Sequence, residues 1–147
     1  MLIAALNKQS SGKIIIYILA VLLLAFLVSM LIMFSREDPE EIYRKNSNMR
    51  IEVLNGCGEN RLAIKVANIL RKQGFNVVRI GDAHKTDFGE TVVIERDDEN
   101  MENAQYVACR IGCKNIGKDI DAALFLEVTI IIGRDYEKIF PDIEKEL

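Results

Sequence analysis

Residues 14–34 read IIIYILAVLLLAFLVSMLIMF, an apolar run that carries no charge and is interrupted only by Tyr17 and Ser29. As a helix this run would be roughly 32 Å long, enough to cross the hydrocarbon core of a bilayer. The alternative, a signal peptide, has an apolar region of only about 7–15 residues followed by a small-residue cleavage site. The following residues contain no Ala-x-Ala pattern and no nearby cysteine that could take a lipid. The run therefore predicts a retained single-span transmembrane helix.

The charges on either side of this run predict its orientation. Lys8 and Lys13 precede it, whereas residues 35–147 hold 17 of the 19 Lys and Arg and all 22 acidic residues, a formal net charge of −5. Because positive flanks stay in the cytoplasm, we expect a cytoplasmic N-terminus and an extracytoplasmic C-terminal part in the cytoplasmic membrane. The net negative charge of that part argues against nucleic acid as a partner.

The remaining chain is long enough for one small hydrophobic core. Residues 1–13 form the predicted cytoplasmic segment, and the polar residues 35–49, with one proline, form a predicted linker. We place the folded domain at residues 50–136 and a C-terminal tail at residues 137–147.

Hydrophobic periodicity predicts alternating helices and strands in the domain. The expected order is a strand at 50–54, a helix at 60–73, strands at 75–80 and 91–95, a helix near 101–111 and a strand at 126–132. Residues 113–124 form either a short extra strand or a loop. This βαββαβ order predicts an α/β (α+β) sandwich with a four-stranded, mainly antiparallel sheet and two helices on one face.

The first strand leads into a glycine-containing turn in the stretch IEVLNGCGEN. A dinucleotide-binding fingerprint needs a third glycine, but Arg61 occupies that place, and the alternating strand differs from the continuous apolar strands of such folds. We therefore expect no nicotinamide or flavin cofactor. The turn is either a simple chain reversal or a site where the helix start attracts an anion. The candidate binding surface comprises Asn55, Gly56, Gly58, Arg61 and Lys65; the alternative for its two cations is a solvated basic helix face.

Four collinear stretches resemble the LytR C-terminal domain family. They are IEVLNGCG at 51–58, LAIKVANILRKQGFNVVRIGDA at 62–83, KTDFGETVV at 85–93 and IIIGRDY at 130–136. The family is an accessory module of LytR/CpsA/Psr cell-envelope proteins that also occurs alone behind a membrane anchor. The resemblance implies an extracytoplasmic, envelope-associated domain and supplies no catalytic site. It does not imply the phosphotransferase activity of the separate catalytic domain of those proteins.

Residues suited to catalysis or metal binding are few. His84 is the only histidine and no serine follows Ser47, so a Ser–His–Asp triad within the domain is excluded. Cys109 and Cys113 are candidates for a local disulfide if the helix ends between them. Together with Cys57 and His84 they supply ligand types that suit zinc. The loop residues Asp82, Asp87 and Glu90 suit a cation or sugar hydroxyls, although a polar connecting loop is the simpler interpretation.

These observations predict a membrane-anchored, non-catalytic domain with a binding or scaffolding role in cell-envelope or cell-wall assembly. Besides the lipid bilayer, the expected partners are an envelope glycan or a membrane-anchored envelope protein. The alternative is a redox- or metal-dependent envelope protein using Cys57, His84, Cys109 and Cys113. A third hypothesis is a structural subunit that docks through its apolar sheet face or its transmembrane helix.

Overall fold

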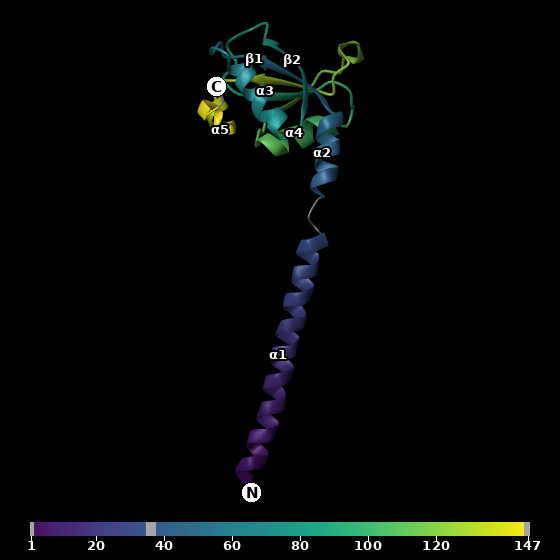
Figure 1. The fold of residues 1–147 in the computed structure, drawn as a ribbon, viewed down its shortest axis with the longest axis vertical. Coiled ribbons are helices and arrows are strands. Elements are labelled where there is room, and N and C mark those ends of the chain that lie inside the picture. The colour runs from purple at the N-terminus through teal and green to yellow at the C-terminus, as the bar shows by residue number, and fades with distance from the viewer. Residues whose placement is uncertain (1, 35–37, 146–147) are drawn as a thin grey trace. The chain divides into compact units, whose positions relative to one another are not determined.

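A computed structural model describes residues 2–34 and 38–145, and the chain divides into two compact units, Met1–Pro39 and Glu40–Leu147. The first unit consists mainly of helix α1 (Leu2–Phe34). Within α1, the 22 residues of Gly12–Met33 are long and apolar enough to cross a membrane. Their side chains are exposed throughout. Figure 1 shows α1 as one uninterrupted helix. Lipid is a suitable environment for this apolar surface, because an α-helix forms the hydrogen bonds of its backbone groups internally.

Helix α2 (Pro39–Asn48) occupies most of the segment that the sequence predicted to be a linker. Pro39 begins it, Glu40 and Glu41 lie in its first turn and Lys45 lies in its last, which suits a helix dipole. Asn46 is only 2% exposed because it packs against the domain. From Pro39 onward the predicted linker 35–49 is therefore helical and packs on the domain through Asn46, while residues 35–37 lie outside the described residues.

The second unit contains a five-stranded sheet in the order β2-β1-β5-β3-β4. The strands are β1 (Arg50–Asn55), β2 (Asn76–Asp82), β3 (Val92–Glu95), β4 (Ile116–Lys118) and β5 (Val128–Ile132). The pairs β1–β2, β1–β5 and β3–β4 are parallel, and only β3–β5 is antiparallel.

The predicted α/β class is confirmed, but the expected four-stranded, mainly antiparallel sheet is not what forms. Helix α3 (Leu62–Lys72) carries the chain back across the sheet, so β2 starts at the same end as β1 and lies beside it in parallel. β4 then adds a fifth strand within the segment 113–124. Alternation of apolar residues reports that one face of a strand is less buried than the other. Since helices cover only one face of this sheet, its parallel strands alternate as well, and alternation therefore did not reveal the strand direction.

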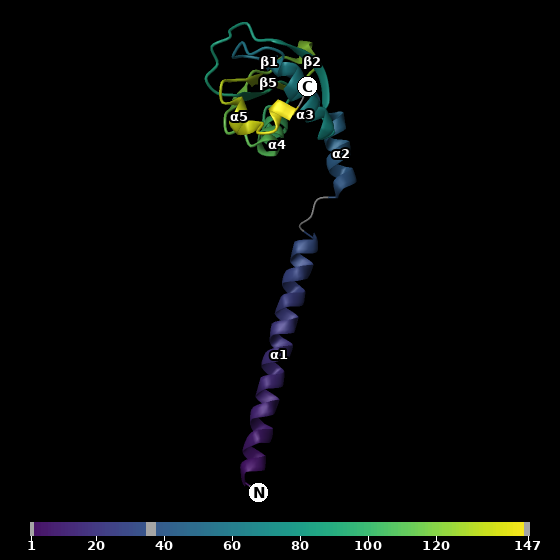
Figure 2. The same ribbon diagram turned by 60° about the vertical axis from the view of Figure 1, so that its left-hand side comes forward.

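Two helices cover one face of the sheet, as predicted (Figures 1 and 2). α3 packs on β1 and β2, and α4 (Glu102–Ile111) packs on β3 and β4. The fully buried side chains of this core come from both layers: Ile51, Val53, Val66, Leu70, Val107, Val128, Ile130 and Ile132. This core lies entirely within the second unit, so we expect residues 39–147 to fold without α1.

The C-terminal segment belongs to the same core. After the short helix α5 (Tyr136–Ile139), Phe140 is 4% exposed, and Ile143 in the 3₁₀ helix η2 (Ile143–Lys145) is 1% exposed. Lys65 of α3 pairs with Glu144 at 4.0 Å. The described part of the predicted C-terminal tail, residues 137–145, therefore packs on the core through Phe140 and Ile143.

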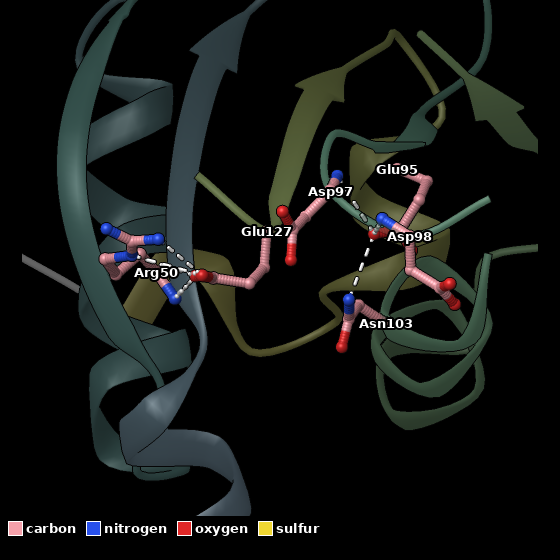
Figure 3. Close-up of polar contacts among 6 residues, drawn as sticks. All are labelled: Arg50, Glu95, Asp97, Asp98, Asn103 and Glu127. Carbon is pink, nitrogen blue, oxygen red and sulfur yellow. Dashed lines mark hydrogen bonds and ion pairs between the residues drawn. The ribbon is translucent and has the colours of Figure 1, made fainter. Parts of the chain in front are cut away.

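Two carboxylates fix the end of the sheet at which β1 begins (Figure 3). Glu127 accepts hydrogen bonds from the guanidinium of Arg50, with a closest distance of 2.6 Å. Glu95, which is 0% exposed, accepts from the backbone N–H of Ala104 at 2.7 Å and from Nδ2 of Asn103 at 3.0 Å. Because these donors lie in the first turn of α4, Glu95 joins the end of β3 to the start of that helix.

Candidate functional site

A cleft of about 740 Å³ opens where the parallel strands β1 and β2 end. The last residues of the two strands, Asn55 and Asp82, are paired in register. Segments 58–64 and 80–82, together with Asn55 and Thr86, line the cleft. In α/β sheets ligands commonly bind outside the carboxyl ends of parallel strands, so this position is suited to a binding site.

The side chain of Asn55 organises the turn beside the cleft. Its Oδ1 accepts from the backbone N–H groups of Cys57 at 3.3 Å and Gly58 at 3.2 Å, while its Nδ2 donates to the carbonyl of Glu59 at 2.8 Å. Asparagine commonly fixes turns in this way. Gly58 has a φ of 80°, in the region that favours glycine. The polar atoms of the Asn55 side chain are thus already hydrogen-bonded within the turn. Asn55 therefore contributes to the cleft by shaping its wall.

Gly56 is required for close packing, and its φ is not positive. A Cβ at this position would lie 2.7 Å from Cγ2 of Ile131, 2.9 Å from the carbonyl oxygen of Ile132 and 2.9 Å from Cδ2 of Phe88. Gly56 also donates its N–H to Ile132 at 2.9 Å. It faces the neighbouring strand β5, and it is not among the residues that line the cleft.

Arg61 immediately precedes α3 and has a φ of 59°, so it takes the left-handed conformation that a glycine would adopt without strain. No side chain caps the helix at this residue. Leu62, Ala63 and Ile64 of the first turn line the cleft. Because the first N–H groups of a helix have no intrahelical acceptor, the start of α3 presents hydrogen-bond donors to this region.

Three of the five residues in the candidate binding surface line the cleft: Asn55, Gly58 and Arg61. Lys65 instead lies toward the C-terminal segment, where it pairs with Glu144. The cleft is also lined by residues that the sequence did not place in this surface: Asn60, Ile80, Asp82 and Thr86. Residues in the range 80–86 join the cleft because β1 and β2 pair in parallel, which brings the two strand ends together. The sequence carried no signal for this pairing.

The cleft mixes charges and polar groups. The positive Arg61 shares it with the negative Glu59 and Asp82, and Asn60 and Thr86 add uncharged hydrogen-bonding groups. Leu62, Ala63 and Ile80 contribute apolar surface. No histidine or cysteine lines the described cleft. The arrangement is suited to hold a polar ligand through hydrogen bonds.

The other candidate residues are dispersed. His84 and Asp87 are exposed, and Glu90 accepts a hydrogen bond from Nδ2 of Asn115 at 2.9 Å. Among the described residues no group of three or more His, Cys, Asp or Glu side chains is placed to hold a metal ion.

In the described structure all three cysteines are free thiols, so the candidate disulfide between Cys109 and Cys113 is not formed. α4 ends at Ile111 with Gly112 in the left-handed conformation, as the sequence suggested. The turn leaves Cys109 exposed but buries Cys113, whose S–H donates to the carbonyl of Thr91 at 3.3 Å. Burial raises the pKa of the Cys113 thiol above its ordinary value, which lowers its reactivity.

Comparison with known proteins gives one family. Residues 48–136, more than half of the chain, match the family model described as LytR cell envelope-related transcriptional attenuator. No curated protein and no solved structure matches the chain. The matched range begins at the end of α2 and includes the whole sheet, α3, α4 and the cleft. The chain therefore belongs to the LytR C-terminal domain family, whose members are associated with the cell envelope.

Proposed function

We propose that this chain is a single-pass membrane protein whose C-terminal domain acts as a non-catalytic binding or scaffolding module in the cell envelope. Family membership supports the association with the envelope. The apolar segment Gly12–Met33 supports a membrane anchor. The charge distribution around it favours a cytoplasmic N-terminus and an extracytoplasmic domain.

The cleft at the ends of β1 and β2 is the proposed binding site, and its position beside the start of α3 is the observation that carries this proposal. Relative to the sequence-based surface, the site keeps Asn55, Gly58 and Arg61 and gains Asp82 and Thr86. Carboxylate, amide, hydroxyl and guanidinium groups together offer donors and acceptors for hydroxyl and amide groups. We therefore propose a glycan of the cell wall as its ligand; a membrane-anchored envelope protein is the other partner considered.

Co-sedimentation of the domain, residues 39–147, with purified insoluble wall glycan tests this proposal. Arg61→Asp reverses the charge in the cleft and keeps a residue type that tolerates the left-handed conformation. Lys65→Glu is the matched control, because it reverses a charge on the same helix outside the cleft. We expect wild type and Lys65→Glu to sediment with the glycan and Arg61→Asp to lose at least about tenfold in affinity.

Two results would contradict the proposal in different ways. Absence of wild-type sedimentation would exclude wall glycan as the ligand. Equal binding by wild type and Arg61→Asp would place any glycan site outside the cleft.

A further inference from the structure

A second surface lies at the other end of the sheet, in the loop that connects β4 to β5. Residues 120–125, here named the apolar knuckle, contain the 3₁₀ helix η1 (Ala122–Leu124). Phe125 is 71% exposed and Ile120 is 36% exposed. Figure 1 shows this yellow-green loop projecting from the sheet. Glu127, just after the knuckle, donates its N–H to the carbonyl of Arg50 at the start of β1, so the knuckle and the cleft lie at opposite ends of that strand.

The knuckle is held in place by hydrogen bonds at its base. Asp119 and Asp121 donate their N–H groups to the carbonyls of Glu95 and Arg96, each at 3.1 Å. Oδ1 of Asp121 also accepts from the N–H of Ala123 at 3.0 Å and so caps η1. Since Glu95 is itself bonded to the start of α4 (Figure 3), the base of the knuckle is tied to the domain core.

The guanidinium of Arg96 also stabilises the base of this loop through side-chain contacts. It donates from Nε to Oγ1 of the buried Thr129 at 3.0 Å and also pairs with the carboxylate of Asp119. These bonds fix the base of the knuckle, from which the apolar side chains project.

Phe125 combines exposure with backbone strain. Its φ of 55° and ψ of 41° place it in the left-handed region, which is unfavourable for a bulky residue. An exposed aromatic side chain on a backbone that is fixed in advance is suited to fill a partner's pocket, because little backbone conformational entropy remains to be lost on binding.

The charges around the knuckle limit what it can contact. Cations near the knuckle are paired with carboxylates: Arg96 with Asp119, Lys118 with Glu99 and Arg50 with Glu127. Asp121 adds a further negative charge. A negative rim is repelled by anionic lipid headgroups. It is also unsuited to the cleft of a second copy, where Glu59 and Asp82 outnumber Arg61.

We propose that the apolar knuckle docks into an apolar pocket rimmed by Lys or Arg on a different protein, with Phe125 as the anchor. The cleft remains accessible when the knuckle is occupied, because the two lie at opposite ends of β1. The chain then joins a protein partner at one end of its domain to the cleft ligand at the other. The docking itself does not depend on the identity of the cleft ligand.

Site-specific photo-crosslinking of the full chain in its native membrane tests this proposal. A benzophenone amino acid replaces Phe125, and the same amino acid at Val78, which is 51% exposed on β2, is the matched control. We expect a discrete adduct with a different protein from position 125 and none from position 78. An adduct of twice the chain's mass, an adduct with lipid, or no adduct specific to position 125 would overturn the proposal.

Capture must be followed by direct titration of the captured protein, purified, against the full chain in detergent. We expect Phe125→Ser to weaken binding at least about tenfold and Val78→Ser to leave it unchanged. Asp121→Asn keeps an acceptor for the N–H of Ala123 but removes the charge, so it should weaken binding and reduce its salt dependence. Unchanged affinity of a folded Phe125→Ser variant would overturn the proposal, as would binding that strengthens when the charge of Asp121 is removed.

Discussion

Several short motifs of this chain are explained by packing at single residues. The glycine at position 56 leaves space for Ile131 and Phe88. In the closing motif IIIGRDY, Oδ1 of Asp135 accepts from both the N–H and the hydroxyl of Thr91, at 2.7 and 2.8 Å. These contacts join loop 83–91 to the end of β5, so they position the wall of the cleft as well as stabilise the fold.

Replacing Gly56 with alanine should destabilise the domain by about 3 kcal/mol, because the new Cβ would overlap atoms of β5 and Phe88. Gly89→Ala is the control, since a Cβ there meets nothing within 4 Å. The control should change the free energy of unfolding by less than about 0.5 kcal/mol. Urea denaturation of residues 39–147 measures both; equal effects would show that Gly56 has no packing role.

The ion pair between Arg50 and Glu127 should make stability depend on acid pH. Partial burial alone would raise the pKa of Glu127, but hydrogen bonds and the charge of Arg50 outweigh it and hold the pKa below its ordinary value of 4.5. A carboxyl group with a lowered folded-state pKa stabilises the protein above its unfolded-state pKa and loses that contribution as pH falls through the folded-state value.

Glu127→Gln should therefore lower stability at neutral pH, and its difference from wild type should shrink as pH falls below about 4.5. Thermal unfolding of residues 39–147 between neutral and acid pH measures this difference. Glu144→Gln, at a position whose side chain is 79% exposed, is the control. A wild-type-to-Glu127→Gln difference that stays constant with pH would contradict the prediction.

Helix α2 is a polar segment that tertiary contacts attach to the domain. Nδ2 of Asn46 donates to the carbonyl of Gln73 at 2.7 Å, and its Oδ1 accepts from the hydroxyl of Tyr106 at 2.8 Å. The ammonium of Lys45 lies 4.0 Å from the centre of the Tyr106 ring. These contacts join α2 to both α3 and α4, although its sequence, PEEIYRKNSN, has few apolar residues.

Asn46→Ala should lower the free energy of unfolding by about 1–3 kcal/mol, because it leaves the Gln73 carbonyl and the Tyr106 hydroxyl without these partners. Ser47→Ala on the same helix is the control, since its hydroxyl bonds only the nearby carbonyl of Arg44. Chemical denaturation of residues 39–147 measures the free energy of unfolding of both variants. Equal stability of the two variants would mean that α2 does not depend on Asn46 for its attachment.

The edges of the sheet are protected against pairing with other chains. On β2, Nη2 of Arg71 donates to the carbonyl of Val77 at 2.9 Å, and the register shifts just beyond this point. β4, at the other edge, is only three residues long. A capped, irregular strand and a very short strand are both common ways of preventing edge-to-edge aggregation.

The proposed topology of the whole molecule places the domain outside the cytoplasmic membrane. In a variant with Cys57→Ser and Cys113→Ala, the exposed Cys109 should react with a membrane-impermeant maleimide in intact cells. A cysteine introduced by Lys8→Cys into a cysteine-free chain should react only after the cells are lysed. The reverse pattern, measured by the mass shift of the labelled chain, would contradict the proposed orientation.

The sequence alone determined the features that depend on local order. A long uncharged apolar run predicts a membrane-spanning length, and periods of two and 3.6 residues place strands and helices. These patterns predicted the α/β class and both helices on one face of the sheet. The glycine turn predicted a candidate binding surface, of which Asn55, Gly58 and Arg61 line the cleft. The collinear motifs also indicated the family that residues 48–136 match.

Only the tertiary structure decided the features that depend on contacts between distant residues. It set the strand directions, brought Asp82 beside Asn55, and showed that Lys65 faces Glu144. It also added α2 and the C-terminal segment to the core through Asn46, Phe140 and Ile143. The physical reason is that periodicity reports which side of an element is buried, whereas it carries no information about which element covers that side.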